Sequence, residues 1–321
     1  MSISFNRQVI DEFRARAGKV GGPFEGGDLL LLTTTGAKSG REHTTPLGYV
    51  RDGGLLLVVA SNLGAPRHPA WFHNLLAHPL VRVELGAGSH EAVAVPAEGA
   101  RRDELFARVV RAEPGYGEYQ SRTSRTLPVV VLERPAAEAE ARAAVTPAAA
   151  GTLAGKLLEV HGWLRAQLRQ VRAEADAHLA ARAAHRGPGE PPAAGLGFQI
   201  RQHCLAFCDT LAFHHTGEDA HVFPALAARH PELRDALERL GTEHRAVARL
   251  KDELVALLAG IDTVEPVRFR AALDRMAERL TEHLDREEEW LLPVLSAIPF
   301  PPGRAPAPPA PETGPGRRPD A

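Results

Sequence analysis

Histidine and glutamate recur at one spacing in two places in the second half of the sequence. His214 is followed four residues later by Glu218, and His283 is followed four residues later by Glu287. A separation of four residues is about one helical turn, so both members of each pair lie on one helix face. Imidazole and carboxylate together suit iron, manganese or zinc. Each pair can therefore supply two metal ligands.

Two further histidines complete this candidate ligand set. His161 lies in LLEVHGWLR and His244 in TEHRAVARL, each in a separate helical pattern. Four such helices would bring four imidazoles and two carboxylates into one bundle, enough for two metal ions with bridging carboxylates. The alternative is a set of histidines satisfied by ordinary hydrogen bonds. That interpretation explains any single histidine, but two matched pairs inside apolar stripes favour metal binding, because a buried carboxylate needs a partner.

The helices that would position these residues are predicted near 152–184, 198–228, 232–259 and 266–297. The last has the clearest pattern, with apolar residues at three- and four-residue spacing. Those residues are Phe269, Leu273, Met276, Leu280, Leu291 and Val294. Such stripes pack the core of a four-helix bundle.

A different kind of candidate site lies in the first half, in the stretch TTGAKSGR at 34–41. Lys38 and Ser39 stand between glycines, and Arg41 follows them. Backbone N–H groups and cationic side chains in such a turn can bind a phosphate or a carboxylate. The spacing of the nucleotide-binding phosphate loop is absent. On the turn alone, an anion site and a plain polar hairpin are equally supported.

The first half is predicted to be mainly β. Apolar or β-branched runs recur at 28–35, 44–51, 54–60, 80–85, 90–95 and 127–133, and helical patterns at 5–17, 69–77 and 101–112. Short strands with few intervening helices favour a small barrel over a doubly wound sheet.

Length and composition agree with two domains in a chain of 321 residues. We expect a barrel at 1–135, an Ala-rich linker at 136–151, a helical bundle at 152–298 and a Pro-rich disordered tail at 299–321, with a further loop at 185–197. The net charge of -2 argues against nucleic-acid binding. Two cysteines exclude a disulfide scaffold. No integral membrane segment and no secretory signal are apparent, so the expected location is cytoplasmic.

The second half resembles the hemerythrin-like, HHE cation-binding family over about residues 153–297. The resemblance is carried by H-x-x-x-E-x-x-x-x-F-P at 214–224 and H-x-x-x-E-x-x-x-x-L-x-P at 283–293. It implies an up-down four-helix bundle around a non-haem di-iron site, with manganese as an alternative metal. The ligands that it implies are His161, His214, Glu218, His244, His283 and Glu287, with His215 as a seventh.

One position departs from the family pattern. Oxygen-carrying hemerythrins have an additional histidine on the third helix, whereas position 248, four residues after His244, is alanine. The resemblance therefore implies a more open site and argues against reversible oxygen carriage.

The first half resembles the deazaflavin-dependent nitroreductase family, in its quinone-reductase branch. The matching segments are FNRQVIDEFRARAGKVGG, LLLLTTTGAKSGREHTTPLGYV, VVASNLGAPRHPAWFHNLLAHP and EPGYGEYQSRTSRTLPVVVLE. The resemblance implies a split β-barrel that binds coenzyme F420 and transfers a hydride from its reduced form to quinone- or nitro-type acceptors. It also makes a homodimer an expected assembly.

Residue roles follow from that resemblance. The phosphate and acidic tail of F420 would be held by Lys38, Ser39 and Arg41, and its ring pocket lined by Thr44, Thr45 and Pro46. The groove would be completed by Ser61, Asn62, Gly64, Trp71 and Asn74. Tyr116 and Tyr119 would lie over the deazaflavin and orient or protonate the acceptor.

Together the two resemblances predict an F420H2-dependent reductase fused to a di-iron domain that binds or reduces O2, peroxide or NO. Two alternatives stay open. The bundle is a sensor of O2, NO or iron that regulates the reductase, or the barrel binds deazaflavin without catalysis.

Overall fold

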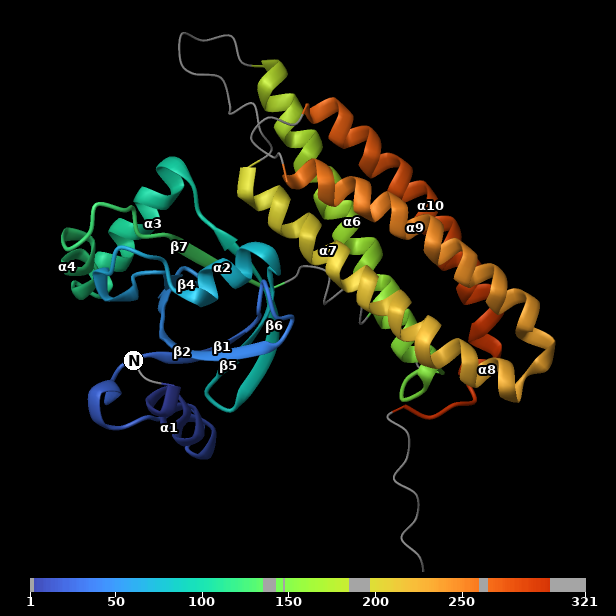
Figure 1. Ribbon diagram of the computed structural model, residues 1–321, viewed down its shortest axis with the longest axis horizontal. Coiled ribbons are helices and arrows are strands. Elements are labelled where there is room, and N and C mark those ends of the chain that lie inside the picture. The colour runs from blue at the N-terminus through green and yellow to red at the C-terminus, as the bar shows by residue number, and fades with distance from the viewer. Residues whose placement is uncertain (1–2, 135–142, 147, 185–196, 260–264, 301–321) are drawn as a thin grey trace, which may run out of the picture.

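The computed structural model describes residues 3–134, 143–146, 148–184, 197–259 and 265–300. Most of the predicted linker, the loop at 185–197 except its last residue, and the tail beyond residue 300 lie outside the described residues. The first half forms an antiparallel sheet, and the second half is helical (Figure 1).

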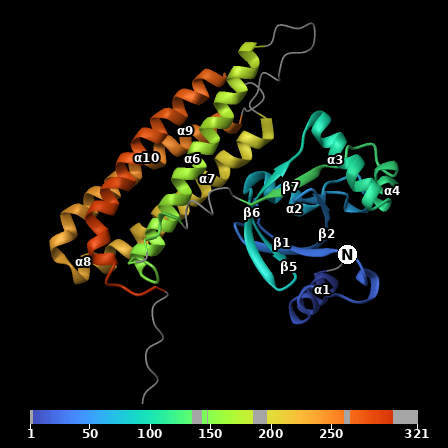
Figure 2. The same ribbon diagram turned by 180° about the vertical axis from the view of Figure 1, so that it is seen from behind.

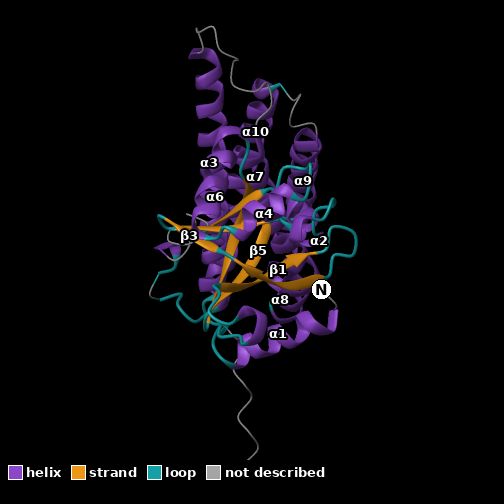
Figure 3. Cartoon of the chain, turned by 90° about the vertical axis from the view of Figure 1, so that its left-hand side faces the viewer, coloured by secondary structure: helices purple, strands orange, loops and turns teal. Residues whose placement is uncertain are grey.

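Seven strands make up the sheet, in the order β2-β1-β5-β6-β7-β4-β3. Their bounds are Leu29–Thr35 (β1), Glu42–Gly48 (β2), Val50–Asp52 (β3), Leu55–Val59 (β4), Leu80–Leu85 (β5), Gly88–Pro96 (β6) and Val129–Glu133 (β7). Only Tyr49 separates β2 from β3, although these strands form the two edges of the sheet. The edges therefore meet at one corner, and the sheet curls into a half-barrel, as predicted (Figure 3).

Strand β1 shows why the sheet needs cover on both faces. It is buried from Leu29 to Thr34. Successive side chains point to opposite faces. Leu30 and Leu32 pack into the main barrel core, and Leu29 and Leu31 pack against the first helix. A continuous apolar run is the pattern expected for a strand covered on both sides.

Four helices accompany the sheet: α1 (Ile3–Ala15), α2 (Ala70–Ala77), α3 (Gly99–Ala112) and α4 (Gly115–Ser121). The sequence patterns predicted the first three. They did not predict α4, because its sequence GYGEYQS has two glycines, which are poor helix formers. The single strand predicted at 44–51 is two strands, since the chain turns the barrel corner at Tyr49.

The bundle consists of α6 (Leu153–Ala184), α7 (Gly197–Gly217), α9 (Arg234–Ala259) and α10 (Pro266–Leu295) (Figure 2). The predicted second helix at 198–228 is interrupted. After α7 a π-helical turn spans Glu218–Val222, and α8 follows at Phe223–Arg229. Proline at 224 has no N–H to donate, so a regular α-helix cannot continue there with all its hydrogen bonds.

Two apolar layers fill the bundle, with polar groups between them. One layer includes Leu164, Val247 and Leu280, and the other includes Leu157, Leu240 and Leu291. The candidate histidines and glutamates fall between these positions on each helix. Among the helices that the structure describes, none combines the length and apolarity needed to cross a bilayer.

Helix α7 joins the bundle to the barrel, lying beside β6 in Figures 1 and 2. Ala206 packs against Val93 and Val95 on β6. The fully buried side chain of Gln202 donates hydrogen bonds to the carbonyl oxygens of Leu75 (2.8 Å) and Ala94 (3.0 Å). The helix is therefore held both to the sheet and to the last turn of α2.

A buried histidine adds an ionic contact to the same interface. His203 lies between Glu133 at the end of β7 (3.3 Å) and Glu174 on α6 (2.7 Å). Burial opposes its protonation, but hydrogen bonds and charge from the two carboxylates outweigh burial and raise the pKa of His203 to about 9. The imidazole is therefore charged at neutral pH, and each half of the chain supplies one of its counter-ions.

Replacing Gln202 by leucine tests this junction. The Gln202→Leu variant leaves two buried carbonyl oxygens without their amide donor, which costs about 1–3 kcal/mol. We expect a lower midpoint of urea unfolding. Gln8→Leu, at an exposed position on α1, is the matched control and should leave the midpoint nearly unchanged. Equal midpoints for both variants would contradict the assigned role of Gln202.

Candidate functional site

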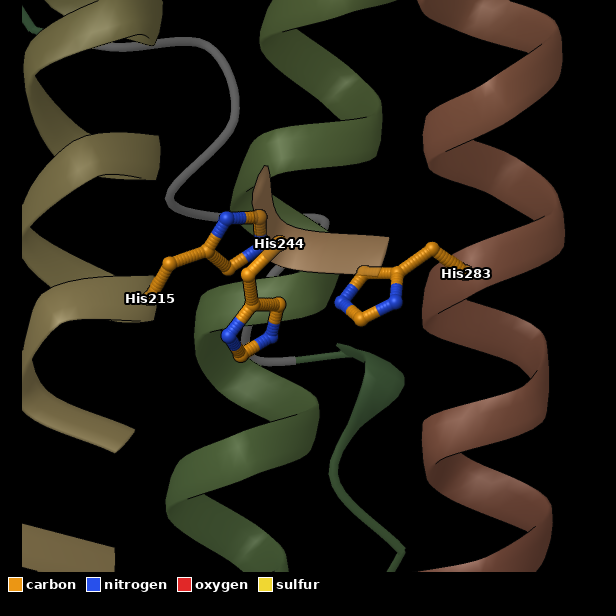
Figure 4. Close-up of side chains that lie close together, drawn as sticks. All are labelled: His215, His244 and His283. Carbon is orange, nitrogen blue, oxygen red and sulfur yellow. The ribbon is translucent and has the colours of Figure 1, made fainter. Parts of the chain in front are cut away.

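The seven histidines and glutamates predicted as metal ligands lie in two adjoining clusters. His215, His244 and His283 form the first, with one ligand nitrogen from each within 4.8 Å of the others. They come from α7, α9 and α10 and point toward one another (Figure 4). The rings of His215 and His244 stack with centroids 3.9 Å apart.

The second cluster holds His161, His214, Glu218 and Glu287, again with ligand atoms within 4.8 Å of one another. All four side chains are buried or nearly so. We name the first group the three-histidine cluster and the second the two-carboxylate cluster.

The carboxylates of the second cluster reach both groups. Glu218 Oε2 lies 3.4 Å from His214 Nε2 and 3.7 Å from His244 Nε2. Glu287 Oε2 lies 3.4 Å from His161 Nε2 and 3.6 Å from His283 Nε2. Each glutamate therefore faces one imidazole from either cluster, which is the placement of a carboxylate that bridges two metal ions.

His161 Nε2 and His214 Nε2 lie 3.0 Å apart and can share a hydrogen bond, but six other atoms of the two clusters have no such partner. Among the described residues, the Nε2 atoms of His215, His244 and His283 are buried without a hydrogen-bond partner. Glu218 Oε2 and both carboxylate oxygens of Glu287 are likewise buried without a hydrogen-bond partner. Unpartnered polar atoms in an apolar interior are costly. Metal ions between them would use all six atoms.

Burial also favours the ligand form of the two imidazoles on α7. Desolvation and the neighbouring histidines lower the pKa of His214 to about 3 and hold that of His215 far below its ordinary value. Both rings are therefore neutral, as metal coordination requires. Burial acts to raise the pKa of Glu287, but the facing His161 and the other surrounding imidazoles overcome it and lower the pKa to about 2.

Glu218 behaves differently because it faces a second carboxylate. Burial and the nearby Glu287 raise the pKa of Glu218 well above its usual range. A pair of close carboxylates in an apolar layer needs positive charge. This requirement again favours a cation between the clusters.

A second row of carboxylates, which the sequence patterns did not identify, orients the imidazoles. The Nδ1 atom of His161 lies 2.8 Å from Glu288, that of His244 2.8 Å from Asp219, and that of His283 3.1 Å from Glu243. A carboxylate that accepts from Nδ1–H leaves Nε2 free for a metal. Each of these acids is next to a candidate ligand in the sequence. This adjacency is the sequence feature that could have identified them.

The π-helical turn lies at the same place. Glu218 is its first residue. Such turns are rare and occur often at functional sites. The extra residue per turn changes the direction of the chain directly after the ligands of α7.

In the barrel, the turn between β1 and β2 carries Lys38, Ser39 and Arg41, all exposed. The turn closes through hydrogen bonds from Gly36 N to the Arg41 carbonyl and from Gly40 N to the Gly36 carbonyl, each 2.8 Å. A Cβ at Gly36 would lie 2.4 Å from Ser39 Oγ, so a larger residue there would displace the serine side chain from its place in the turn.

Asn74 on α2 anchors this turn. Its side-chain oxygen accepts from Ala37 N (3.1 Å), and its amide donates to Thr34 Oγ1 (3.1 Å). The predicted cofactor residue Asn74 thus lies next to the predicted phosphate turn. Trp71, predicted for the same groove, is 6% exposed and packs in the barrel core.

The predicted residues Ser61, Asn62 and Gly64 form a tight turn after β4. Asn62 and Leu63 have positive φ angles of 47° and 55°, which non-glycine residues seldom adopt. A Cβ at Gly64 would lie 2.8 Å from the carbonyl oxygen of Tyr119. Strained backbone of this kind persists where neighbouring contacts hold it, often at functional sites.

Arg125 supplies those contacts and is a residue that sequence analysis missed. Its guanidinium donates to the carbonyl oxygens of Ser61 (2.6 Å), Ala65 (2.9 Å) and Ala60 (3.1 Å). The segment RTSRTLP was part of the family resemblance, but nothing in its letters shows which backbone an arginine contacts.

The remaining predicted residues lie on β2 and α4. Thr44, Thr45 and Pro46 lie on β2 opposite Thr33, Leu32 and Leu31. Tyr116 and Tyr119 on α4 pack edge to face, with ring centroids 6.0 Å apart. A Cβ at Gly48, the end of β2, would lie 3.2 Å from Tyr116 Oη. Burial and the nearby Glu113 raise the pKa of Tyr116 to about 12.

Comparisons with known proteins agree with this division. Residues 5–134 match the family model described as F420H(2)-dependent quinone reductase, and residues 152–295 match the hemerythrin HHE cation binding domain. An F420H(2)-dependent quinone reductase of Mycobacterium tuberculosis H37Rv is 43% identical over 128 residues, which are 38% of this chain and 85% of the relative.

Two solved structures are each similar to part of the chain. The F420-H2 dependent reductase FDR-A is 40% identical, with a TM-score of 0.31, over 33% of this chain and 94% of that chain. A structure described as a domain-swapped dimer is 34% identical, with a TM-score of 0.33, over 40% of this chain and 98% of that chain. With its 85% coverage of the mycobacterial enzyme, the chain belongs to the F420H(2)-dependent quinone reductase family and carries a hemerythrin HHE domain in its second half.

Proposed function

We propose that this chain is an F420H2-dependent oxidoreductase that reduces quinone- or nitro-type acceptors, with a two-metal centre in its hemerythrin domain. The barrel of residues 1–135 carries the reductase and the bundle of residues 152–298 the metal centre. The observation that carries the metal centre is the pair of glutamates, each facing an imidazole of both clusters. Family membership and the anchored turn at Lys38 support the reductase.

F420 supplies hydride chemistry, and the barrel supplies binding and orientation. Lys38 and Arg41 offer positive charge to its phosphate and acidic tail, and Ser39 a hydroxyl. Asn74 holds their turn in place from α2. Preorganisation of this kind lowers the ordering cost of binding.

Tyr116 is suited to orient the acceptor. With a pKa of about 12 its phenol keeps its proton at neutral pH. It can therefore donate a hydrogen bond to an acceptor oxygen, where negative charge grows as a hydride arrives. Tyr119 packs against it and fixes its ring.

In the bundle, His215, His244 and His283 would hold one metal ion, and His161 and His214 the other. Glu218 and Glu287 would bridge them. Iron at these positions supplies one-electron redox chemistry and affinity for O2, peroxide or NO. Position 248 on α9 is alanine, so α9 offers no second histidine there. The third imidazole of the three-histidine cluster comes instead from His215 on α7.

Charge at the turn between β1 and β2 governs cofactor affinity in this proposal. Lys38→Ala and Arg41→Ala each remove a charge-assisted contact, and we expect the Kd for F420 to rise roughly 10-fold in each. Isothermal titration calorimetry measures this. Arg16→Ala, an exposed arginine paired with Glu12 on α1, is the control. Unchanged affinity in both turn variants, or an equal loss in the control, would show that the cofactor binds elsewhere.

Loss of the Tyr116 hydroxyl should affect turnover and not cofactor binding. We expect Tyr116→Phe to lower kcat roughly 10- to 100-fold with little change in the Kd for F420. Because the phenol stays protonated well below pH 12, the parent enzyme should show no loss of kcat due to this group from pH 6 to 10. Tyr49→Phe, between β2 and β3, is the matched control. A parent-like kcat in Tyr116→Phe would remove the tyrosine from the mechanism.

Metal content tests the two clusters directly. Elemental analysis of the purified chain should give two metal ions per chain, and identifies iron or manganese. His215→Ala should reduce the content to about one, because the three-histidine cluster loses a ligand. His221→Ala, at an exposed histidine three residues beyond Glu218, should retain two. A parent chain without metal would refute the metal centre.

A further inference from the structure

The last turn of α2 has carbonyl oxygens that need donors from elsewhere in the chain. The final carbonyl groups of an α-helix have no partner within the helix. Helical geometry would give the Leu75 carbonyl the N–H of residue 79, but that residue is Pro79, which has none. For the Leu76 carbonyl the donor would be the N–H of Leu80, which already belongs to β5. Both oxygens therefore depend on donors from outside α2.

Two neighbouring side chains of α7 donate to these two oxygens. Gln202 Nε2 donates to the Leu75 carbonyl at 2.8 Å, and Arg201 Nη1 donates to the Leu76 carbonyl at 2.7 Å. Arg201 Nη1 also donates to Gln202 Oε1 at 2.7 Å, so each side chain holds the other in place. The arginine charge also faces the negative end of the α2 dipole. A helix of the bundle thus caps a helix of the barrel.

A third contact from α7 holds the residue that follows α2. His78 Nδ1 lies 3.1 Å from the carboxylate of Asp209, which is about two turns beyond Gln202 on α7. Helix α2 has only eight residues. A helix of that length is not stable by itself and depends on packing and caps for its position. The contacts from α7 therefore help to set where α2 ends.

The same short helix fixes the turn between β1 and β2. Asn74 accepts a hydrogen bond from Ala37 N (3.1 Å) and donates one to Thr34 Oγ1 (3.1 Å), so it ties that turn to β1. Asn74 directly precedes Leu75, whose carbonyl Gln202 caps. A shift of the end of α2 would therefore displace Asn74 and, through Ala37, the turn itself.

We propose that Arg201 and Gln202 of the bundle are positioning residues for the F420 site of the barrel. They act through the end of α2 and through Asn74 on the turn that carries Lys38 and Arg41. This inference rests on the proposed role of that turn in holding F420. The second half of the chain thus contributes to cofactor affinity as well as carrying the metal clusters.

Calorimetric titration of the full-length chain with F420 tests the inference. Arg201→Met removes the donor to the Leu76 carbonyl, and Gln202→Leu removes the donor to Leu75, so the Kd for F420 should rise roughly 3- to 10-fold in each. Arg201→Lys keeps a cationic donor and should stay within about twofold of the parent. Arg201→Met should also raise the KM for F420H2 but leave kcat at saturating F420H2 unchanged, because Tyr116 lies outside this route.

A control on the same helix separates positioning from loss of stability. His203 contacts Glu133 and Glu174. His203→Gln removes the cation between these carboxylates, so we expect a lower midpoint of urea unfolding but a parent-like Kd for F420. Every titration is made under conditions where the variant is fully folded. An equal rise of the Kd in His203→Gln would overturn the inference, since any weakening of the junction would then suffice.

A double-mutant cycle tests the route through Asn74. Asn74→Ala alone should weaken F420 binding roughly 10-fold. In that background Arg201→Met should add less than about twofold, because the link from α2 to the turn is already cut. Additive losses would show that Arg201 acts by another route and would overturn the inference.

The outcomes also separate this inference from the proposed cofactor site. Parent-like affinity in both Arg201→Met and Gln202→Leu overturns the inference alone if Lys38→Ala still weakens F420 binding. A chain whose affinity for F420 does not respond to Lys38→Ala or Arg41→Ala overturns the proposed site together with the inference.

Discussion

The structure of the second half depends on one electrostatic constraint: a layer of imidazoles and carboxylates lies inside an apolar bundle. Without positive charge, Glu218 and Glu287 would oppose each other across a short distance in a medium that screens poorly. The apolar layers above and below hold the helices in place, and the outer carboxylates at Asp219, Glu243 and Glu288 turn the rings so that their lone pairs converge. The bundle is thus arranged around this buried polar layer.

The barrel differs from the bundle, because in an F420-dependent family the cofactor carries the hydride chemistry and the protein has to bind and orient it. The curl of the sheet brings the two edge strands to one corner at Tyr49, and Tyr116 lies beside the end of β2 there. Hydrogen bonds fix the two turns of the candidate site. The turn at Gly36 is closed by its own backbone and anchored by Asn74, and the strained turn at Asn62 is held by the guanidinium of Arg125. Each positions backbone, which is what a site for a phosphate-bearing cofactor requires.

Much of this could be predicted from the sequence because the signals were local. The spacing from His214 to Glu218 places two candidate ligands about one turn apart, and the run at Leu29 to Leu32 marks a covered strand. The unpredicted features arise from tertiary structure. The helix α4 forms despite its glycines because Tyr116 and Tyr119 pack into the barrel core. No local pattern shows that Arg125 reaches the turn after β4, or that His203 pairs with both halves of the chain.

Helix α7 contacts two different parts of the protein along its length. Its first turns contact the sheet through Gln202, and its last turn presents His214 and His215 to the bundle interior. Each residue added to an α-helix rotates everything beyond it by about 100°. The angle between the barrel-facing and ligand-bearing faces is therefore set by how many residues separate them. A substitution in this interval leaves that angle unchanged, but a single insertion or deletion there would turn His214 and His215 away from their partners.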